Sequence, residues 1–389
     1  MKTGVRIKTQ KGATTMEKMM ILVIDGCAPE YLTPQTAPDL YRLTAQHGFA
    51  KTVLGAIPSV TNVNHACILS GQFPEATKVV GNYYYDPVTH AEGFIEERGV
   101  MQAQTILQAY QQAGGKTALL TVKGKVLGVY GAGADIGISV QTPDKALLDN
   151  LGLPLPPQVQ DPASTEWILQ AALACIEKEQ PDLVYCTNND FVFHHYGPQT
   201  AEAKEQIRAV NDYVKKIHEL DPQRRIYITA DHGMNQKTRL LNFQALADNA
   251  GLKLFCLPPL KDRYVENHIY QEGGILYIFL EQDADRLAFL RLASSAPEVE
   301  RILTGAEAGR EFQLPAEQLG DYVLLAAPGC AFGEVRGERL TTDAVRTHGS
   351  LYEREVPLLA INPQAGPDSY RYSKDITAVA LNIKGECEK

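Results

Sequence analysis

Carboxylates and imidazoles gather in four short motifs, each placed at the end of an apolar run or just before one. The motifs are Asp25-Gly26, Asp190-Phe-Val-Phe-His194, Asp231-His232-Gly233 and Thr347-His348-Gly349. Residues four apart share one face of a helix, so the second motif could direct both of its side chains at one metal ion. Carboxylate oxygen and imidazole nitrogen, without thiolate, suit catalytic ions of the Zn²⁺ type that keep open positions. Each motif alone could also be a helix cap or an Asx turn.

A candidate nucleophile lies in the segment from Pro58 to Gly71. Pro58 and Ser59 end the preceding segment, and the residues from Thr61 onward predict a helix that Gly71 closes. The N-terminus of a helix attracts anions through its N–H groups and dipole. Thr61 could therefore be a plain cap, or its hydroxyl could be a nucleophile that a metal ion makes easier to ionise. We expect Asn64 and His65 to support this helix by packing.

Buried strands are expected to position these motifs. Four continuous apolar runs precede polar clusters, namely Met19–Ile24, Lys116–Val122, Asp182–Cys186 and Arg225–Thr229. Runs without alternation are typical of parallel strands buried on both faces. Helical patterns lie between them, at Ala103–Ala113, Thr165–Glu179 and Thr200–Leu220. The alternation predicts an α/β, doubly wound, largely parallel sheet with helices on both faces, in which ligands gather beyond the carboxyl ends of the strands.

The stretch 251–338 interrupts this alternation. It contains strand-like runs at Ile275–Leu280 and Tyr322–Ala327 around a helical pattern at Ala284–Ser295. We interpret it as a small α+β cap inserted into a catalytic core formed by residues 19–250 and 339–389, with Val356–Ile361 as a late core strand. The basic, polar residues 1–18 are expected to be a disordered N-terminal extension.

The composition of the 389 residues limits the partners. Hydrophobic residues make up 44% and charged residues 21%, which is typical of globular proteins. The net charge of −9 argues against nucleic acid or an anionic membrane as the main partner, although a local pocket for a small anion is compatible with it. Seven cysteines without a CxxC pair, and no apolar run of membrane-spanning length, favour a cytoplasmic location. An exposed strand edge or the cap could form a homodimer, but no pattern requires one.

Taken in order, these motifs resemble those of the alkaline phosphatase superfamily. They are most similar to its phosphodiesterase-like branch, which includes nucleotide pyrophosphatase/phosphodiesterases and phosphonoacetate hydrolases. The resemblance extends from about Met20 to the end of the chain and implies the alkaline-phosphatase-like fold. It implies two Zn²⁺ ions, with Fe or Mn as an alternative at one site. By this resemblance Asp190, His194 and His348 hold one ion, while Asp25, Asp231 and His232 hold the other, with Thr61 bridging to it.

Two further features bear on the substrate. Asn82 follows Gly81, and the resemblance implies that its amide binds a phosphoryl oxygen, although a Gly-Asn turn is an equal alternative. Lys123 and Lys125 stand two apart after an apolar run, and in an extended segment both ammonium groups would face one anion. A pair of this kind is also common on a solvated edge. Phosphonoacetate hydrolases look similar here, with a Lys-x-Lys pair that grips the substrate carboxylate.

The sequence therefore predicts a small anionic organophosphorus substrate. The first hypothesis is cleavage of the carbon–phosphorus bond of phosphonoacetate, to acetate and phosphate, through a phosphothreonine at Thr61. The alternative is a nucleotide pyrophosphatase/phosphodiesterase with the same metals and nucleophile, in which Tyr83-Tyr84-Tyr85 could supply an aromatic slot for a base. A sulfatase is disfavoured, because the nucleophile position holds Thr61 rather than the Cys or Ser of a CxPxR-like motif.

Overall fold

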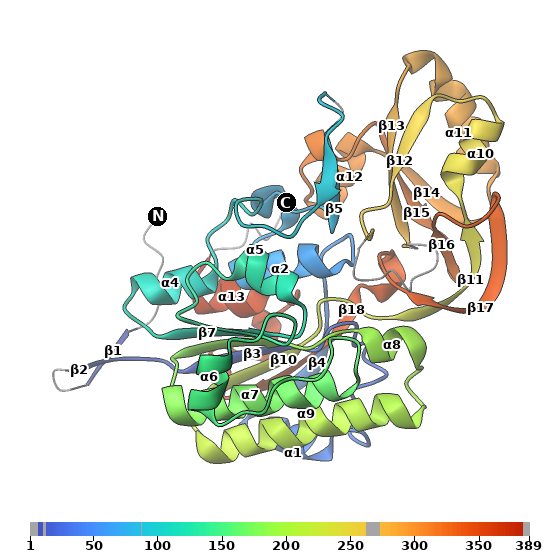
Figure 1. Ribbon diagram of the computed structural model, residues 1–389. Helices are drawn as coiled ribbons and strands as arrows, with labels where there is room; N and C mark the ends of the chain where they lie inside the picture. The colour runs from blue at the N-terminus through green and yellow to red at the C-terminus, as the bar shows by residue number, and fades with distance from the viewer. Residues whose placement is uncertain (1–6, 11–12, 87, 262–272, 384–389) are drawn as a thin grey trace.

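A seven-stranded sheet forms the centre of the molecule, in the order β4-β18-β10-β3-β9-β7-β8 (Figure 1). The computed structural model describes residues 7–10, 13–86, 88–261 and 273–383. The strands are β3 (Met19–Val23), β4 (Gly48–Leu54), β7 (Thr117–Thr121), β8 (Ile136–Ser139), β9 (Leu183–Thr187), β10 (Arg225–Thr229) and β18 (Glu355–Ile361). Five neighbouring strands, from β10 to β8, are parallel, and β18 runs antiparallel to both of its neighbours. The predicted largely parallel sheet is confirmed.

Helices cover both faces of this sheet (Figure 1). One face carries α1 (Pro38–His47), α6 (Lys145–Leu151), α7 (Ala163–Glu179) and α9 (Ala201–Leu220), and the other carries α2 (Thr61–Ser70), α4 (Ile106–Gln112), α5 (Gly124–Tyr130) and α13 (Asp375–Ala380). The residues of β3, β7 and β9 are buried throughout, as expected of strands covered on two sides. Helix α4 begins later than predicted because Thr105 caps it in a capping box with Gln108.

A second sheet of four antiparallel strands stands apart from the first, in the order β12-β13-β15-β14. Its strands are β12 (Leu254–Leu257), β13 (Ile275–Leu280), β14 (Val299–Thr304) and β15 (Tyr322–Ala326). Apolar side chains of α10 (Phe243–Asn249) and α11 (Arg286–Ser295) pack on one face, and those of α12 (Gly305–Phe312) on the other. We call this unit the cap sheet.

A third sheet joins the cap sheet to the core, in the order β16-β11-β17. It consists of β11 (Asn235–Leu241), β16 (Cys330–Phe332) and β17 (Arg339–Thr347). β11 and β17 lie in the ranges predicted as core, yet they pair with β16 inside the range predicted as cap. The two long strands pair with Asn235 opposite Thr347, so the segments that carry His232 and His348 are brought together.

The described part of the N-terminal segment differs from the expected disordered extension. β1 (Ile7–Gln10) and β2 (Ala13–Met16) pair as an antiparallel hairpin. Residues 1–6 and 11–12 of that segment lie outside the described residues. Across the described ranges, no helix has both the length and the apolar character needed to cross a membrane.

Candidate metal centre

The candidate metal ligands lie where strands end. Asp25 follows β3, Asp190 follows β9, Asp231 follows β10 and His348 follows β17. The first three of these strands are adjacent and parallel, so their carboxyl ends share one edge of the central sheet. The ligands thus converge from segments far apart in sequence.

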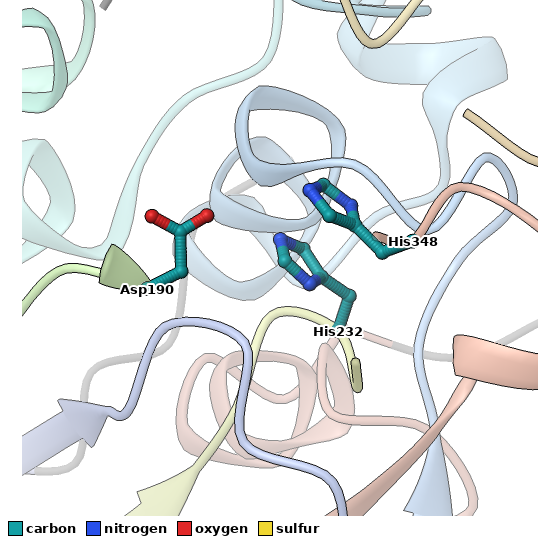
Figure 2. A group of neighbouring side chains, drawn as sticks. All are labelled: Asp190, His232 and His348. Carbon is teal, nitrogen blue, oxygen red and sulfur yellow. The ribbon is translucent and has the colours of Figure 1, made fainter. Parts of the chain in front are cut away.

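Two overlapping groups of buried side chains could each hold an ion. One contains Asp25, Asp231 and His232, and the other contains Asp190, His232 and His348 (Figure 2). Within each group the potential ligand atoms lie within 4.8 Å of one another. The rings of His232 and His348 are stacked, with their centroids 3.5 Å apart and their planes 7° from parallel.

His194 lies beside the second group. Helix α8 (Phe191–His195) begins directly after Asp190, as the four-residue spacing predicts, and His194 Nε2 is 3.0 Å from Asp190 Oδ2. Its ring centroid is 5.7 Å from that of His348. The second group therefore has His232 where the resemblance implies His194, and His194 contacts the Asp190 carboxylate of that group. His195, the next residue, is exposed and bonds to the carbonyl of Phe191 through Nδ1.

Each of the three histidines forms a hydrogen bond between its Nδ1 and a backbone carbonyl oxygen. His194 pairs with Arg346 O at 2.7 Å, His232 with Gly233 O at 2.9 Å, and His348 with Ser59 O at 2.7 Å. A carbonyl only accepts, so these contacts assign the proton to Nδ1 and leave the Nε2 lone pair directed at the site. Metal-binding histidines are commonly oriented in this way.

Two carboxylate oxygens at the site are buried and, among the described residues, have no hydrogen-bond partner. They are Asp25 Oδ1 and Asp231 Oδ2, which lie 3.5 and 3.3 Å from His232 Nε2. Burial, with the charge of Asp190 next, raises the pKa of Asp25 well above its usual value, and burial raises that of Asp231 to about 6. A buried carboxylate with an unpaired oxygen is costly. A divalent cation would satisfy both oxygens, so the residues present fit a metal site.

Lys123 joins the two groups. Its Nζ lies 2.8 Å from Asp25 Oδ2 and 2.6 Å from Asp190 Oδ1, opposite the oxygens that face the histidines. Burial alone would raise the pKa of Asp190, but the charges of Lys123 and His194 outweigh it and hold that pKa well below its usual value.

The prediction that Lys123 and Lys125 lie in an extended segment is wrong. Lys123 is the residue before α5, and Lys125 lies in the first turn of that helix. The turn begins directly after β7, so the alternation of side chains along a strand does not apply. Both lysines are nevertheless buried rather than on a solvated edge. Burial, and then the charges of Lys123 and Lys125, hold the pKa of His65 well below its usual value.

Thr61 begins α2, as the sequence predicts, and its Oγ1 lies 3.2 Å from His232 Nε2. Gly71 ends the helix in the left-handed conformation. Asn64 accepts a hydrogen bond from the backbone N–H of Ala56 at 2.7 Å, and His65 Nδ1 lies 2.6 Å from the hydroxyl of Tyr185. Asn64 and His65 therefore hold the helix and the loop before it, while the Thr61 hydroxyl faces the ligand groups.

Asn82 lies between α2, which begins at Thr61, and the segment that follows β12. Its Oδ1 accepts from the backbone N–H of Asn62 at 3.2 Å, and its Nδ2 donates to Leu260 O at 3.2 Å. Its own backbone N–H donates to Pro259 O at 2.7 Å. The segment that follows β12 thus touches the residue beside Thr61.

The three tyrosines after Asn82 are divided between packing and solvent. They form β5 (Tyr83–Tyr85), which pairs with β6 (Glu92–Phe94). The ring of Tyr83 packs on Phe94, and the ring of Tyr85 packs on Phe255 and Phe279 of the cap sheet. Tyr84, which is 41% exposed, is the most exposed of these three, and Tyr85 is partly buried.

Sequence reasoning missed two residues that orient the histidines. Arg346 accepts from His194 through its carbonyl and donates from Nε to Phe193 O at 2.9 Å, which ties β17 to α8. Ser59 accepts from His348 through its carbonyl. Both act through backbone carbonyls, which every residue carries, so residue type gives no signal.

The chain matches the model of a known family over most of its length. Residues 19–351 match the model of the family described as type I phosphodiesterase / nucleotide pyrophosphatase. The chain belongs to this family. An ectonucleotide pyrophosphatase/phosphodiesterase of Caenorhabditis elegans is 26% identical over 64% of this chain and 32% of its own length. Human ectonucleotide pyrophosphatase/phosphodiesterase family member 1 is 23% identical over 56% of this chain and 23% of its own length. The chain thus spans a third or less of these two relatives.

Solved structures match more completely. Phosphonoacetate hydrolase from Sinorhizobium meliloti, in complex with phosphonoformate, is 27% identical with a TM-score of 0.84, covering 97% of this chain and 99% of that chain. Murine ectonucleotide pyrophosphatase/phosphodiesterase 5 has a TM-score of 0.69 at 16% identity over 96% of this chain and 97% of its own, which shows a shared fold. The predicted resemblance to the alkaline phosphatase superfamily is confirmed.

Proposed function

We propose that the protein is a metal-dependent hydrolase that cleaves the carbon–phosphorus bond of phosphonoacetate to acetate and phosphate. The observation that carries the proposal is the pair of buried lysines at the end of β7, one of which touches both ligand groups beside Thr61. A dianionic phosphonyl group suits the metal site, and a carboxylate suits the lysines. Similarity to the S. meliloti phosphonoacetate hydrolase over 97% of the chain supports the same substrate.

We further propose which residues would hold the ions. Asp190, His194 and His348 would hold one Zn²⁺, and Asp25, Asp231 and His232 would hold the other, with Thr61 beside it; Fe or Mn could replace zinc at one site. Ions bound there would supply Lewis-acid chemistry, drawing charge from the phosphonyl oxygens and lowering the pKa of the Thr61 hydroxyl.

The residues of the chain would then act in sequence. Thr61 Oγ gives up its proton to solvent and attacks phosphorus, a P–O bond forms, and the P–C bond breaks with its electron pair on carbon. Lys123 and Lys125 stabilise the charge that this pair delocalises into the carboxylate, and a solvent proton completes acetate. The Asn82 amide, which here donates to Leu260, would turn its donor to a phosphoryl oxygen. Water then cleaves the phosphothreonine, which releases phosphate and restores Thr61.

A nucleotide pyrophosphatase/phosphodiesterase using the same site is the second candidate. The family model and the curated relatives favour it, and the exposed Tyr84 ring could stack on a base. Against it, Tyr83 and Tyr85 are occupied by packing on Phe94 and on the cap sheet, and a nucleotide offers no carboxylate to the buried lysines.

The test compares two substrates on the same zinc-loaded preparation. We expect kcat/KM for phosphonoacetate to exceed that for a nucleotide phosphodiester such as the nitrophenyl ester of thymidine monophosphate. Acetate and phosphate should appear in equal amounts, measured by proton and phosphorus NMR. A higher kcat/KM for the nucleotide ester, with no acetate from phosphonoacetate, would favour the second candidate.

We also propose a cytoplasmic location. The six cysteines among the described residues are all buried thiols without a disulfide. Unpaired thiols are typical of a reducing compartment. Fractionation of the native host would test the proposal, and recovery of the protein outside the cytoplasm would contradict it.

A further inference from the structure

A fully buried ion pair lies next to the metal centre but contains none of its candidate ligands. Lys237 of β11 and Glu353, which follows the His348 loop, are each 1% exposed, and Lys237 Nζ lies 2.6 Å from Glu353 Oε1. Taking two charges out of water commonly costs as much as their attraction returns, so such a pair is a poor source of stability. A gain in stability therefore does not explain why this ion pair lies beside the candidate metal ligands.

Glu353 connects the two segments that carry His232 and His348. Its backbone carbonyl accepts from the N–H of Gly233, the residue after His232, at 2.7 Å. Its Oε2 accepts from the Ser350 N–H at 3.0 Å and from the Ser350 hydroxyl at 2.5 Å, two residues after His348. One residue thus bonds to both segments at once.

The network continues to the nucleophile loop. The hydroxyl of Ser59 donates to Ser350 O at 2.8 Å and accepts from the Gly349 N–H at 3.1 Å. The carbonyl of Ser59 accepts from His348 Nδ1, and Thr61 follows two residues later. The order of contacts therefore runs from Lys237 through Glu353 and Ser350 to the loop that presents Thr61.

Lys237 fixes this network to the sheet that joins core and cap. It lies on β11 opposite Val345 of β17, two residues before Thr347 and three before His348. Asn235, on the same strand, donates its amide to the same Glu353 oxygen at 2.9 Å. The Glu353 carboxylate thus receives bonds from both the strand after His232 and the loop after His348, where the two imidazoles stack.

We propose that Lys237 and Glu353 are positioning residues that set the separation and orientation of His232 and His348 for metal binding. This inference rests on the proposed metal site, and it deepens that proposal by naming the pair that organises the site from outside. Removing the charge of either partner leaves the other charge buried and lets the two histidine segments move apart. Residues that orient metal ligands typically change metal affinity 10- to 100-fold when replaced.

The variants are Lys237→Met, Glu353→Gln and the double variant. We expect each single variant to lose at least about tenfold in zinc affinity, measured by competition with a chromophoric chelator well below its melting temperature. The double variant should lose less than the product of the two single losses, because neither partner then leaves an unpaired charge. At saturating zinc we expect kcat to fall more than KM rises, because Lys123 and Lys125, which would bind the substrate carboxylate, are unchanged.

A matched control lies at the opposite end of the central sheet. Arg224 is fully buried, pairs with Asp221 at 3.3 Å and donates to the carbonyls of Met19 and Pro181. Arg224→Met should lower the melting temperature of the metal-free protein while its zinc affinity stays within twofold of wild type. Because Asp221 is partly exposed, the variant shows what removing one buried charge from an ion pair does to stability alone.

A second readout needs no metal. Imidazole ¹⁵N NMR of the metal-free wild type should show His232 and His348 as Nδ1–H tautomers, and both Lys237→Met and Glu353→Gln should shift them towards a mixture. The inference would be overturned if a folded variant kept the zinc affinity of the wild type and the same tautomers of His232 and His348. Failure of the wild type itself to bind two ions would instead contradict the proposed metal site, so the two failures are distinguishable.

Discussion

The edge of the central sheet and the cap sheet are built in opposite ways. At the central edge the buried side chains are polar, and among the described residues both groups able to hold a metal ion lie there. The cap sheet is covered on both faces by apolar side chains, with aromatic rings of Phe255 and Phe279 packed against Tyr85. The side chains able to hold a metal ion are concentrated in the first region, whereas the second is built around apolar packing.

The topology explains the difference. Adjacent parallel strands end at one edge, so β3, β9 and β10 deliver Asp25, Asp190 and Asp231 to the same place. Antiparallel strands send alternate ends to opposite edges, and the cap sheet has no comparable gathering point. The cap reaches the site through the backbone of Pro259 and Leu260, which bonds to Asn82.

Loss of the nucleophile should have the largest effect. We expect Thr61→Ala to lower kcat for phosphonoacetate by about 10³-fold or more, because no hydroxyl remains to form the covalent intermediate. Metal content, measured by elemental analysis, should stay at the wild-type value. Thr61→Ser, which keeps a hydroxyl, is the control and should retain part of the activity. Full activity of Thr61→Ala would exclude the covalent route.

Loss of the histidine shared by both ligand groups should come next. His232→Ala should reduce bound zinc and lower kcat by about 10²-fold at fixed zinc. The neighbouring side chains are not expected to replace the lost ligand. His195→Ala removes an exposed imidazole next to His194 and should leave zinc content and activity unchanged. Equal zinc content in wild type and His232→Ala would contradict the proposal that metal ions bind at this edge of the central sheet.

Loss of both buried lysines should discriminate between substrates. Lys123→Met with Lys125→Met should lower kcat/KM for phosphonoacetate about 10²-fold more than for an aryl phosphate ester, because only phosphonoacetate places a carboxylate there. The exposed Lys145→Met is the control for a simple change of charge. Equal losses of kcat/KM on both substrates would contradict the proposal that the two lysines bind the substrate carboxylate.

A change in the cap sheet should affect stability more than chemistry. Phe279→Ala should lower the free energy of unfolding by about 3 kcal/mol, since its ring is buried among aromatic neighbours. Zinc content of the folded protein should not change. Leu287→Ala, at an exposed position of α11, should change stability by less than about 0.5 kcal/mol. Loss of zinc from folded Phe279→Ala would show that metal binding at the central sheet depends on packing in the cap sheet.

Much of this architecture could be predicted, because it depends on local patterns. The run Arg225–Thr229 coincides with β10 and the run Ile275–Leu280 with β13. The sheet of β11, β16 and β17 was missed because five of the seven residues of β11 are polar, which leaves no apolar run to mark a strand, and because its partner β17 lies about a hundred residues later in the chain. The candidate ligands could be named from their motifs, since strand ends converge in this fold, and their role as ligands stays a prediction.

The orientation of the ligands could not be predicted. It depends on carbonyls of Gly233, Ser59 and Arg346, and on the pairing of Lys237 with Glu353, partners that only the folded chain brings together. The conformation of Lys125 was mispredicted because the turn into α5 comes immediately after β7.

Anomalous diffraction from crystals of the zinc-loaded protein would locate the bound ions directly. We expect two zinc peaks next to the Thr61 hydroxyl, one enclosed by Asp190, His194 and His348 and the other by Asp25, Asp231 and His232. Zinc peaks elsewhere on the molecule, or none among these side chains at saturating zinc, would contradict it.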